Sequence, residues 1–160
     1  SVSIEPFNFN ADGSIPLIHP TKEGVAKSAS NLDPFAKVEA ETIAWSEGLK
    51  TAKDTKTGVY VTKINNDDYI KVRSVDFGEG AKKFEASVAS NTQGGKIEIR
   101  VGSVTGTLLG TCLVKPTGGE TSWTVRTCKT KKMKGLHDIY FVFKGGEGEL
   151  FNFDWWSFKK

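Results

Sequence analysis

The sequence predicts an all-β domain, and three observations carry that prediction. Short segments alternate apolar and polar side chains, a pattern typical of strands that turn one face to a core. Turn-forming residues separate these segments, and the 160-residue chain contains 17 glycines. No segment repeats its apolar residues at the spacing of about 3.6 that an amphipathic helix shows. Together these patterns favour a two-sheet β-sandwich with jelly-roll topology.

The expected strands are short and are separated by turns rich in glycine, asparagine or aspartate. They lie at residues 37–43, 59–64, 69–75, 83–89, 96–101, 108–114, 123–128, 138–144 and 150–158. The turns lie at residues 65–68, 78–80, 92–95, 105–106, 118–119 and 145–146. Strands at this regular spacing are typical of sandwiches rather than of folds in which helices alternate with strands.

Residues 1–32 differ from the rest of the chain. Residues 2–9 alternate like a strand and are followed by Asn10-Ala-Asp-Gly, a turn signal, and later by a polar connector at 21–32. One strand and a linker cannot bury a core of their own. We therefore expect residues 1–32 to be a remnant strand of a preceding domain plus a linker, and residues 33–160 to form the sandwich. Since the first residues do not resemble a signal peptide, we expect the chain to begin inside a larger precursor.

Composition narrows the possible function classes. The net charge of +3 is small for this length and gives no reason to expect a nucleic-acid partner. The basic run at 129–134 has no interleaved aromatic residue and is expected to be a solvated loop. No apolar run is long enough to cross a bilayer, so no membrane partner is expected. Neither His19 nor His137 has the neighbours of a zinc site, and no phosphate loop or Ser/His/Asp arrangement is visible.

The two cysteines, Cys112 and Cys128, fall in consecutive strand segments joined by the turn at 116–119. A hairpin folded at that turn would bring them opposite each other and within disulfide reach. The sequence therefore favours a disulfide and a secreted protein. Two buried free thiols in a cytosolic protein remain the alternative.

The last expected strand carries two polar residues that need partners. By strand alternation, Asn152 and Asp154 share one face with Trp156, opposite the aromatic residues at 151, 153 and 155. Polar groups are costly to bury without hydrogen-bond partners. We therefore expect each of the two to contact the backbone, a metal or a ligand.

Glu39 and Glu41 lie two residues apart in an expected strand, so both carboxylates project from one face. Two like charges this close repel each other unless a cation lies between them. With Asp154 and backbone carbonyls they would supply the oxygen ligands that Ca²⁺ prefers. Two alternatives stay open: two solvated glutamates at a sheet edge, and a general acid/base pair, although glycosidase carboxylates flank the sugar from opposite sides.

The segment Gly118-Gly-Glu-Thr-Ser-Trp123 places an indole ring beside a loop, where it could meet the amide of Asn152. An indole face stacks on the apolar face of a pyranose, and an amide hydrogen-bonds sugar hydroxyls. The two residues are therefore a candidate sugar-binding pair. The alternative is that Trp123 is a core residue, since tryptophan is highly buried on average.

A series of segments runs in order through residues 33–160. They are Lys37-Val-Glu-Ala-Glu-Thr, Ile64-Asn-Asn-Asp-Asp-Tyr-Ile-Lys-Val, Val75-Asp-Phe-Gly, Gly94-Gly-Lys-Ile-Glu-Ile-Arg, Thr117-Gly-Gly, Gly135-Leu-His-Asp-Ile-Tyr-Phe-Val-Phe-Lys-Gly-Gly and Leu150-Phe-Asn-Phe-Asp-Trp-Trp. Together they resemble a family 6 carbohydrate-binding module. The resemblance implies a non-catalytic β-jelly-roll that holds a secreted glycoside hydrolase on polysaccharides such as xylan and β-glucans. Residues 1–15 are similar to the end of a family 43 glycoside hydrolase, which implies a covalently linked xylosidase or arabinofuranosidase domain.

The resemblance also implies site residues. Glu39, Glu41 and Asp154 correspond to the ligands of a structural Ca²⁺ ion. Trp123 and Asn152 correspond to members of a sugar site at the loop end of the sandwich.

This chain departs from the family pattern at Lys63, which stands where a second aromatic residue usually sandwiches the sugar. Losing one stacking face would cost about 1–2 kcal/mol of binding free energy. Three outcomes are open: Tyr60 fills the gap, Lys63 pairs with an acidic sugar such as a glucuronic acid branch, or the site is weak. Tyr60 has its own alternative as a core or edge-strand residue.

Some family members also bind sugar along the concave sheet face. There Tyr69 corresponds to the central aromatic residue, and Lys71 with Glu98 or Arg100 would supply polar groups. A cross-strand ion pair is the alternative for these charges.

The predicted function is therefore that of a secreted, monomeric, non-catalytic module that binds xylan or arabinoxylan. One alternative is a structural domain that packs on a family 43 hydrolase and binds little or no glycan. Another is a β-glucan-binding module that uses the concave face, and a third is an enzyme with Glu39 and Asp154 as catalytic residues.

Overall fold

The computed structural model of the protein describes residues 7–19 and 31–160. The chain divides into two units, residues 1–30 and residues 31–160. In the first unit the predicted turn is confirmed, because the backbone N–H of Gly13 donates to the carbonyl of Asn10 at 2.9 Å. Residues 7–10 are not in a strand. The rest of the strand predicted at 2–9 and most of the connector at 21–32 lie outside the described residues.

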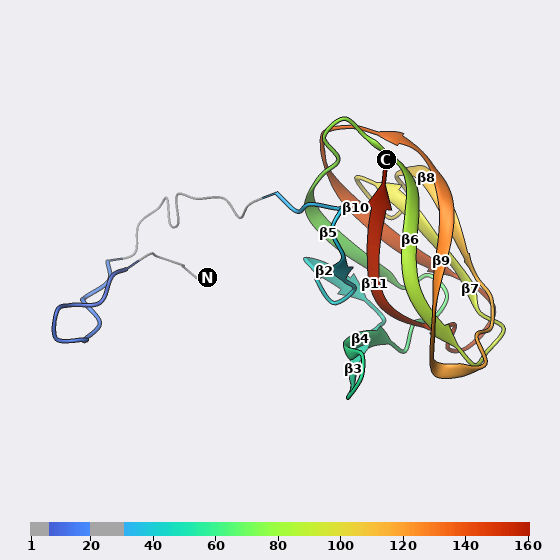
Figure 1. Ribbon diagram of the computed structural model, residues 1–160, viewed down its shortest axis with the longest axis horizontal. Helices are drawn as coiled ribbons and strands as arrows, with labels where there is room; N and C mark the ends of the chain where they lie inside the picture. Colours follow the sequence, from blue (N-terminus) through green and yellow to red (C-terminus); the bar gives the residue numbers. More distant parts are fainter. Residues whose placement is uncertain (1–6, 20–30) are drawn as a thin grey trace. The chain divides into compact units, whose positions relative to one another are not determined.

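The second unit is a sandwich of two antiparallel sheets, which confirms the predicted all-β fold (Figure 1). The five-stranded sheet has the order β2-β5-β10-β7-β8, and the six-stranded sheet has the order β3-β4-β11-β6-β9 with β1 paired to β11. The strands are β1 (Val38–Glu39), β2 (Trp45–Glu47), β3 (Lys50–Asp54), β4 (Gly58–Thr62), β5 (Tyr69–Asp76), β6 (Ala81–Ser90), β7 (Gly95–Val101), β8 (Thr107–Val114), β9 (Gly119–Met133), β10 (Leu136–Lys144) and β11 (Asn152–Lys159). No helix among the described residues is long and apolar enough to cross a membrane.

The strand prediction failed for the three short strands β1, β2 and β3. The strand predicted at 37–43 is reduced to β1, and β2 and β3 were missed because they are short, polar and largely exposed. The basic run predicted to be a loop lies in β9 up to Met133, with its lysines exposed. β9 is an edge strand, where exposed lysines discourage pairing with another chain.

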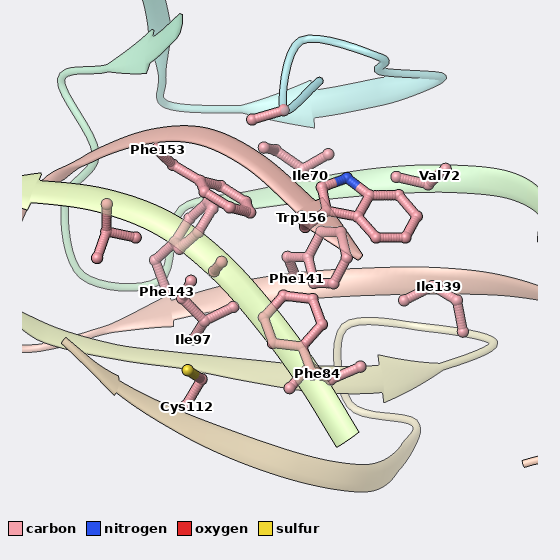
Figure 2. Close-up of a cluster of buried hydrophobic side chains, with 14 of the residues drawn as sticks. Ile70, Val72, Phe84, Ile97, Cys112, Ile139, Phe141, Phe143, Phe153 and Trp156 are labelled. Carbon is pink, nitrogen blue, oxygen red and sulfur yellow. The ribbon is translucent and has the colours of Figure 1, made fainter. Parts of the chain in front are cut away.

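The core is a continuous cluster of aromatic and aliphatic side chains between the two sheets. Figure 2 shows Phe84 and Trp156 from the six-stranded sheet on either side of Phe141 from the five-stranded sheet. The ring centroids of Phe84 and Phe141 are 5.4 Å apart, and those of Phe141 and Trp156 are 5.1 Å apart. Offset and edge-to-face pairs of this kind add about 0.5–1.5 kcal/mol each beyond the burial of their area.

The alternation predicted along the last strand was only half right. The pairing register of β11 with β6 shifts between Phe153 and Trp155, so Asp154 lies in a bulge. A bulge inserts one extra residue and reverses the alternation beyond it. Phe153 and Trp156 therefore both face the core, where each is fully buried, and Trp155 is only half-buried.

Both cysteines are free thiols, so the disulfide that the sequence favoured is not formed. They do not oppose each other within one hairpin, because Cys112 lies on β8 in the five-stranded sheet and Cys128 on β9 in the six-stranded sheet. The contact of the Cys112 thiol with Cys128, together with burial, raises the pKa of Cys112. The same contact lowers the pKa of Cys128, although burial opposes that shift.

We expect a thiol reagent to modify Cys128 in the folded protein and to reach Cys112 only after unfolding. The thiolate is the reactive form, and Cys112 is fully buried with a raised pKa. Peptide mass spectrometry after timed labelling at pH 8 measures the two rates separately. A Cys128→Ser variant is the control and is expected to remain unlabelled until denaturant is added. Equal labelling rates at the two sites in the native protein would contradict this arrangement.

Candidate functional site

A groove of about 510 Å³ opens at the end of the six-stranded sheet where β4 ends and β11 begins. The register explains which side chains line it. Val61 of β4 pairs with Phe153 and both are fully buried, so their neighbours Tyr60, Thr62 and Asn152 turn to the outer face. Three residues predicted from the sequence therefore line the groove together: Tyr60, Lys63 and Asn152.

Asn152 presents one side of its amide to the groove. The residue is only 8% exposed, and its Nδ2 donates to the carbonyl of Glu120 at 2.7 Å. Its Oδ1 accepts no hydrogen bond from the residues that the structure describes. Asn152 therefore has a fixed orientation and an acceptor that is available for a hydroxyl group.

Trp123 packs against Tyr60 but is not among the side chains that line the groove. The two ring centroids are 5.2 Å apart with an interplanar angle of 71°, an edge-to-face arrangement. Trp123 is half-buried, and its Nε1 is buried without a hydrogen-bond partner among the described residues. Of the alternatives open for Tyr60, the structure places its ring in the groove and not in the core.

Lys63 does not have a free ammonium group. Its Nζ is 2.5 Å from Oε1 of Glu149, whose side chain also lines the groove. The hydrogen bond to Glu149 and the negative charge of that carboxylate raise the pKa of Lys63. Glu149 could not be predicted as the partner of Lys63, because it lies 86 residues away in the chain, beyond any local pattern.

The carboxylates of Glu41 and Asp154 are the strongest metal candidates. Oε2 of Glu41 and Oδ1 of Asp154 are buried without hydrogen-bond partners among the described residues. Burial raises the pKa of Glu41, and the charges of Glu39 and Asp154 raise it further. Burial also raises the pKa of Asp154. Buried carboxyl oxygens without partners fit a cation, since an oxygen-rich site is what Ca²⁺ requires.

Glu39 points elsewhere in this structure. Its Oε1 is 3.0 Å from Nζ of Lys37, and both side chains are about half exposed. Within residues 7–19 and 31–160, no three His, Cys, Asp or Glu side chains lie close enough to form a metal site. Of the three predicted calcium ligands, Glu39 is therefore the one that pairs with a side-chain cation, the ammonium group of Lys37.

The outer face of the five-stranded sheet carries a second group of aromatic residues. The rings of Tyr69 and Tyr140 are 6.1 Å apart, and Trp45 on the edge strand β2 is 65% exposed. The register places Trp45 beside Lys71, which in turn lies beside Tyr140. Trp45 was missed from the sequence, although a tryptophan followed by Ser46-Glu47-Gly48 was a usable signal.

The charged residues predicted for this second face form ion pairs. Lys71 Nζ is 3.1 Å from Oδ2 of Asp138 on β10, the cross-strand pair that was the alternative. Glu98 is only 8% exposed and lies 2.7 Å from Nη2 of Arg100. Burial raises the pKa of Glu98, but hydrogen bonds from Arg100 and Lys96 outweigh it, so the pKa is lowered. The carboxylate of Glu98 is therefore already satisfied by its own strand.

The sequence of residues 39–160 matches the profile of the family described as carbohydrate binding module (family 6). The chain belongs to this family. The expectation of a carbohydrate-binding module without catalytic activity is thereby confirmed.

Three relatives of the module show how far the likeness extends. The arabinoxylan arabinofuranohydrolase of Bacillus subtilis (strain 168) is 46% identical over 156 residues, which is 93% of this chain and 30% of that protein. A family 6 module from Clostridium cellulolyticum, solved in complex with xylose, is 42% identical with a TM-score of 0.79, over 81% of this chain and 100% of its own. A β-1,3-glucan-binding family 6 module from Bacillus halodurans is 38% identical with a TM-score of 0.78, over 82% of this chain and 100% of its own.

The chain thus spans less than a third of the length of the curated arabinoxylan arabinofuranohydrolase that it matches. The likeness to that protein extends into residues 1–32, as the sequence analysis expected from the resemblance of residues 1–15 to the end of a family 43 hydrolase. The assignment of residues 1–32 to a remnant strand and a linker stays a prediction.

Proposed function

We propose that this module binds the xylan backbone of arabinoxylan in the groove at the end of the six-stranded sheet. The observation that carries the proposal is the lining of that groove, which combines the Tyr60 ring, supported from behind the lining by Trp123, with the available Oδ1 of Asn152. A pyranose has apolar C–H faces and hydroxyl edges, so an aromatic surface next to an amide acceptor suits it. Xylose in the Clostridium cellulolyticum relative and arabinoxylan in the name of the Bacillus subtilis relative support xylan as the target.

The proposed setting is a secreted glycoside hydrolase in which this module is covalently linked to the catalytic domain. The names of the relatives support this setting, since the matched Bacillus subtilis protein is a longer hydrolase. In such a protein the module would hold the enzyme on its polysaccharide and so raise the local substrate concentration. The module itself is proposed to act as a monomer.

We also propose a structural Ca²⁺ ion held by Glu41, Asp154 and Glu39. The partnerless buried oxygens of Glu41 and Asp154 support it, and Glu39 would exchange Lys37 for the metal. The ion would supply the positive charge that lets these carboxylates stay ionised in a partly buried position. It would also tie the segment around β1 to the bulge of β11, beside the strand that carries Asn152.

A second candidate function is binding of β-glucan on the outer face of the five-stranded sheet. The exposed ring of Trp45 and the neighbouring rings of Tyr69 and Tyr140 favour it, because exposed aromatic residues without a packing role are typical of sugar platforms. The relative from Bacillus halodurans is named for β-1,3-glucan binding, which supports the glycan but not the face.

Migration in native gels that contain soluble polysaccharide tests the proposal and its alternatives. Wild-type protein is run beside Trp123→Ala and Tyr69→Ala in xylan, arabinoxylan, glucuronoxylan, barley β-glucan and laminarin. The proposal predicts retardation by xylan and arabinoxylan that Trp123→Ala loses and Tyr69→Ala keeps. Retardation by β-glucan that only Tyr69→Ala loses would favour the second candidate. If wild type migrated without retardation in every gel, the result would favour the alternative of a structural domain that binds no glycan.

A further inference from the structure

The rim of the groove is built by two chain segments that a backbone hydrogen bond holds together. The N–H of Leu150 donates to the carbonyl of Ile64 at 2.8 Å, and both side chains are buried in the core. The residues on either side of this bond, Lys63 and Glu149, are therefore fixed as neighbours. Their side chains are both about half exposed, and this backbone pairing holds them within reach of each other.

The backbone around Lys63 is fixed as well. Lys63 has a φ of 57°, in the left-handed region that a residue with a side chain rarely adopts. Its carbonyl accepts a hydrogen bond from Nδ2 of Asn65 at 2.9 Å, and the N–H of Asn65 donates to Oδ2 of Asp68 at 2.8 Å. This turn directs the Lys63 side chain to the groove, where its Nζ is 2.5 Å from Oε1 of Glu149.

The charged side chains that line the groove are one lysine and two glutamates, Lys63, Glu120 and Glu149. Oε1 of Glu120 accepts a hydrogen bond from Nδ2 of Asn91 at 2.9 Å, which orients its carboxylate. The pKa of Lys63 is raised by its hydrogen bond to Glu149, by the charge of Glu149, and also by the charge of Glu120. One ammonium group thus faces two carboxylates, and the groove has a net charge of −1.

We infer that this groove selects neutral xylosyl residues and rejects those that carry a uronic acid, because Glu149 already pairs with the one cationic side chain among the described residues of the lining and Glu120 adds a negative charge. The inference rests on the proposed function and names the substrate class of the same site. A uronate that entered the groove would meet a net negative lining. To reach the Lys63 ammonium it would have to displace Glu149 and leave that carboxylate unpaired.

Glu149→Gln is the variant that tests this selectivity. It removes one negative charge and releases Lys63, and both changes favour an acidic ligand. Isothermal titration measures the affinity for xylotetraose and for xylotetraose with one glucuronic acid branch, and the ratio of the two affinities is the readout. From the interaction of unit charges about 7 Å apart, we expect the ratio to shift about three- to tenfold towards the acidic ligand. Glu120→Gln is a second variant with the same expected direction.

The matched control is Glu79→Gln, because Glu79 forms an exposed pair with Lys134 at 2.8 Å and does not line the groove. This control is expected to leave the ratio of the two affinities unchanged. In addition, 1 M salt screens the charges of the groove, so the preference of wild type for the neutral ligand should shrink. One result would overturn this inference alone: wild type binds the neutral xylotetraose, and the ratio of the two affinities is the same in wild type, Glu149→Gln and Glu120→Gln. Failure of wild type to bind either oligosaccharide would overturn the proposed function, and this inference with it.

Discussion

Removal of the proposed Ca²⁺ ion is expected to lower the melting temperature of the module by about 5–10 °C. An ion that binds only the folded state stabilises it by about 2.7 kcal/mol at a concentration 100 times its dissociation constant. For a chain of this size, about 1 kcal/mol corresponds to roughly 2–4 °C. The physical source is the pair of buried oxygens on Glu41 and Asp154 that have no partner among the described residues. Differential scanning calorimetry in EDTA and then in excess Ca²⁺ measures the shift.

Asp154→Asn is expected to abolish this shift, because it removes the charge of the most buried proposed ligand. Glu147→Gln is the matched control, since Glu147 is exposed and is not a proposed ligand. The control should retain the full response to calcium. If the wild-type protein had the same melting temperature in EDTA and in Ca²⁺, the result would contradict the proposed calcium site.

Trp123→Ala is expected to weaken xylan binding by about 10- to 30-fold, which corresponds to roughly 1.4–2 kcal/mol. Aromatic residues that form or directly support a small binding site commonly carry this much binding free energy. Trp123 also supports the ring of Tyr60, at a centroid distance of 5.2 Å, so its loss would free Tyr60 as well. Isothermal titration with xylotetraose measures the change.

Trp45→Ala is the matched control for Trp123→Ala, because it removes an exposed tryptophan from the other sheet. Its affinity for xylotetraose should equal that of wild type. Both variants should melt near the wild-type temperature, since neither ring lies in the fully buried core. Loss of binding in Trp45→Ala, with none in Trp123→Ala, would move the site to the five-stranded sheet.

The sequence predicted the fold well because the strand pattern is local. Alternation between turn signals was enough to find the long strands of both sheets, from β4 to β11. It failed at β2 and β3, which are short and have little apolar surface to alternate. It also failed at Asp154, because a bulge depends on the pairing of β11 with β6 and leaves no mark in the alternation itself.

The site was predicted less completely because its contacts are not local. Tyr60, Lys63 and Asn152 were named from the sequence and the structure brings them to one groove. The partner of Lys63 could not be named, since Glu149 reaches it only through the pairing of Leu150 with Ile64. The cysteines show the same limit, because consecutive strands were assumed to share a sheet and here they do not.

The indole N–H resonances of the four tryptophans provide the most direct test of where this module binds xylan. Trp123 packs against Tyr60, which lines the groove, Trp45 lies on the outer face of the five-stranded sheet, and Trp156 lies in the core. In a titration of ¹⁵N-labelled protein with xylotetraose, the resonance of Trp123 is expected to shift progressively while those of Trp45 and Trp156 stay in place. A shift of the Trp45 resonance with a stationary Trp123 would contradict the assignment of xylan binding to this groove.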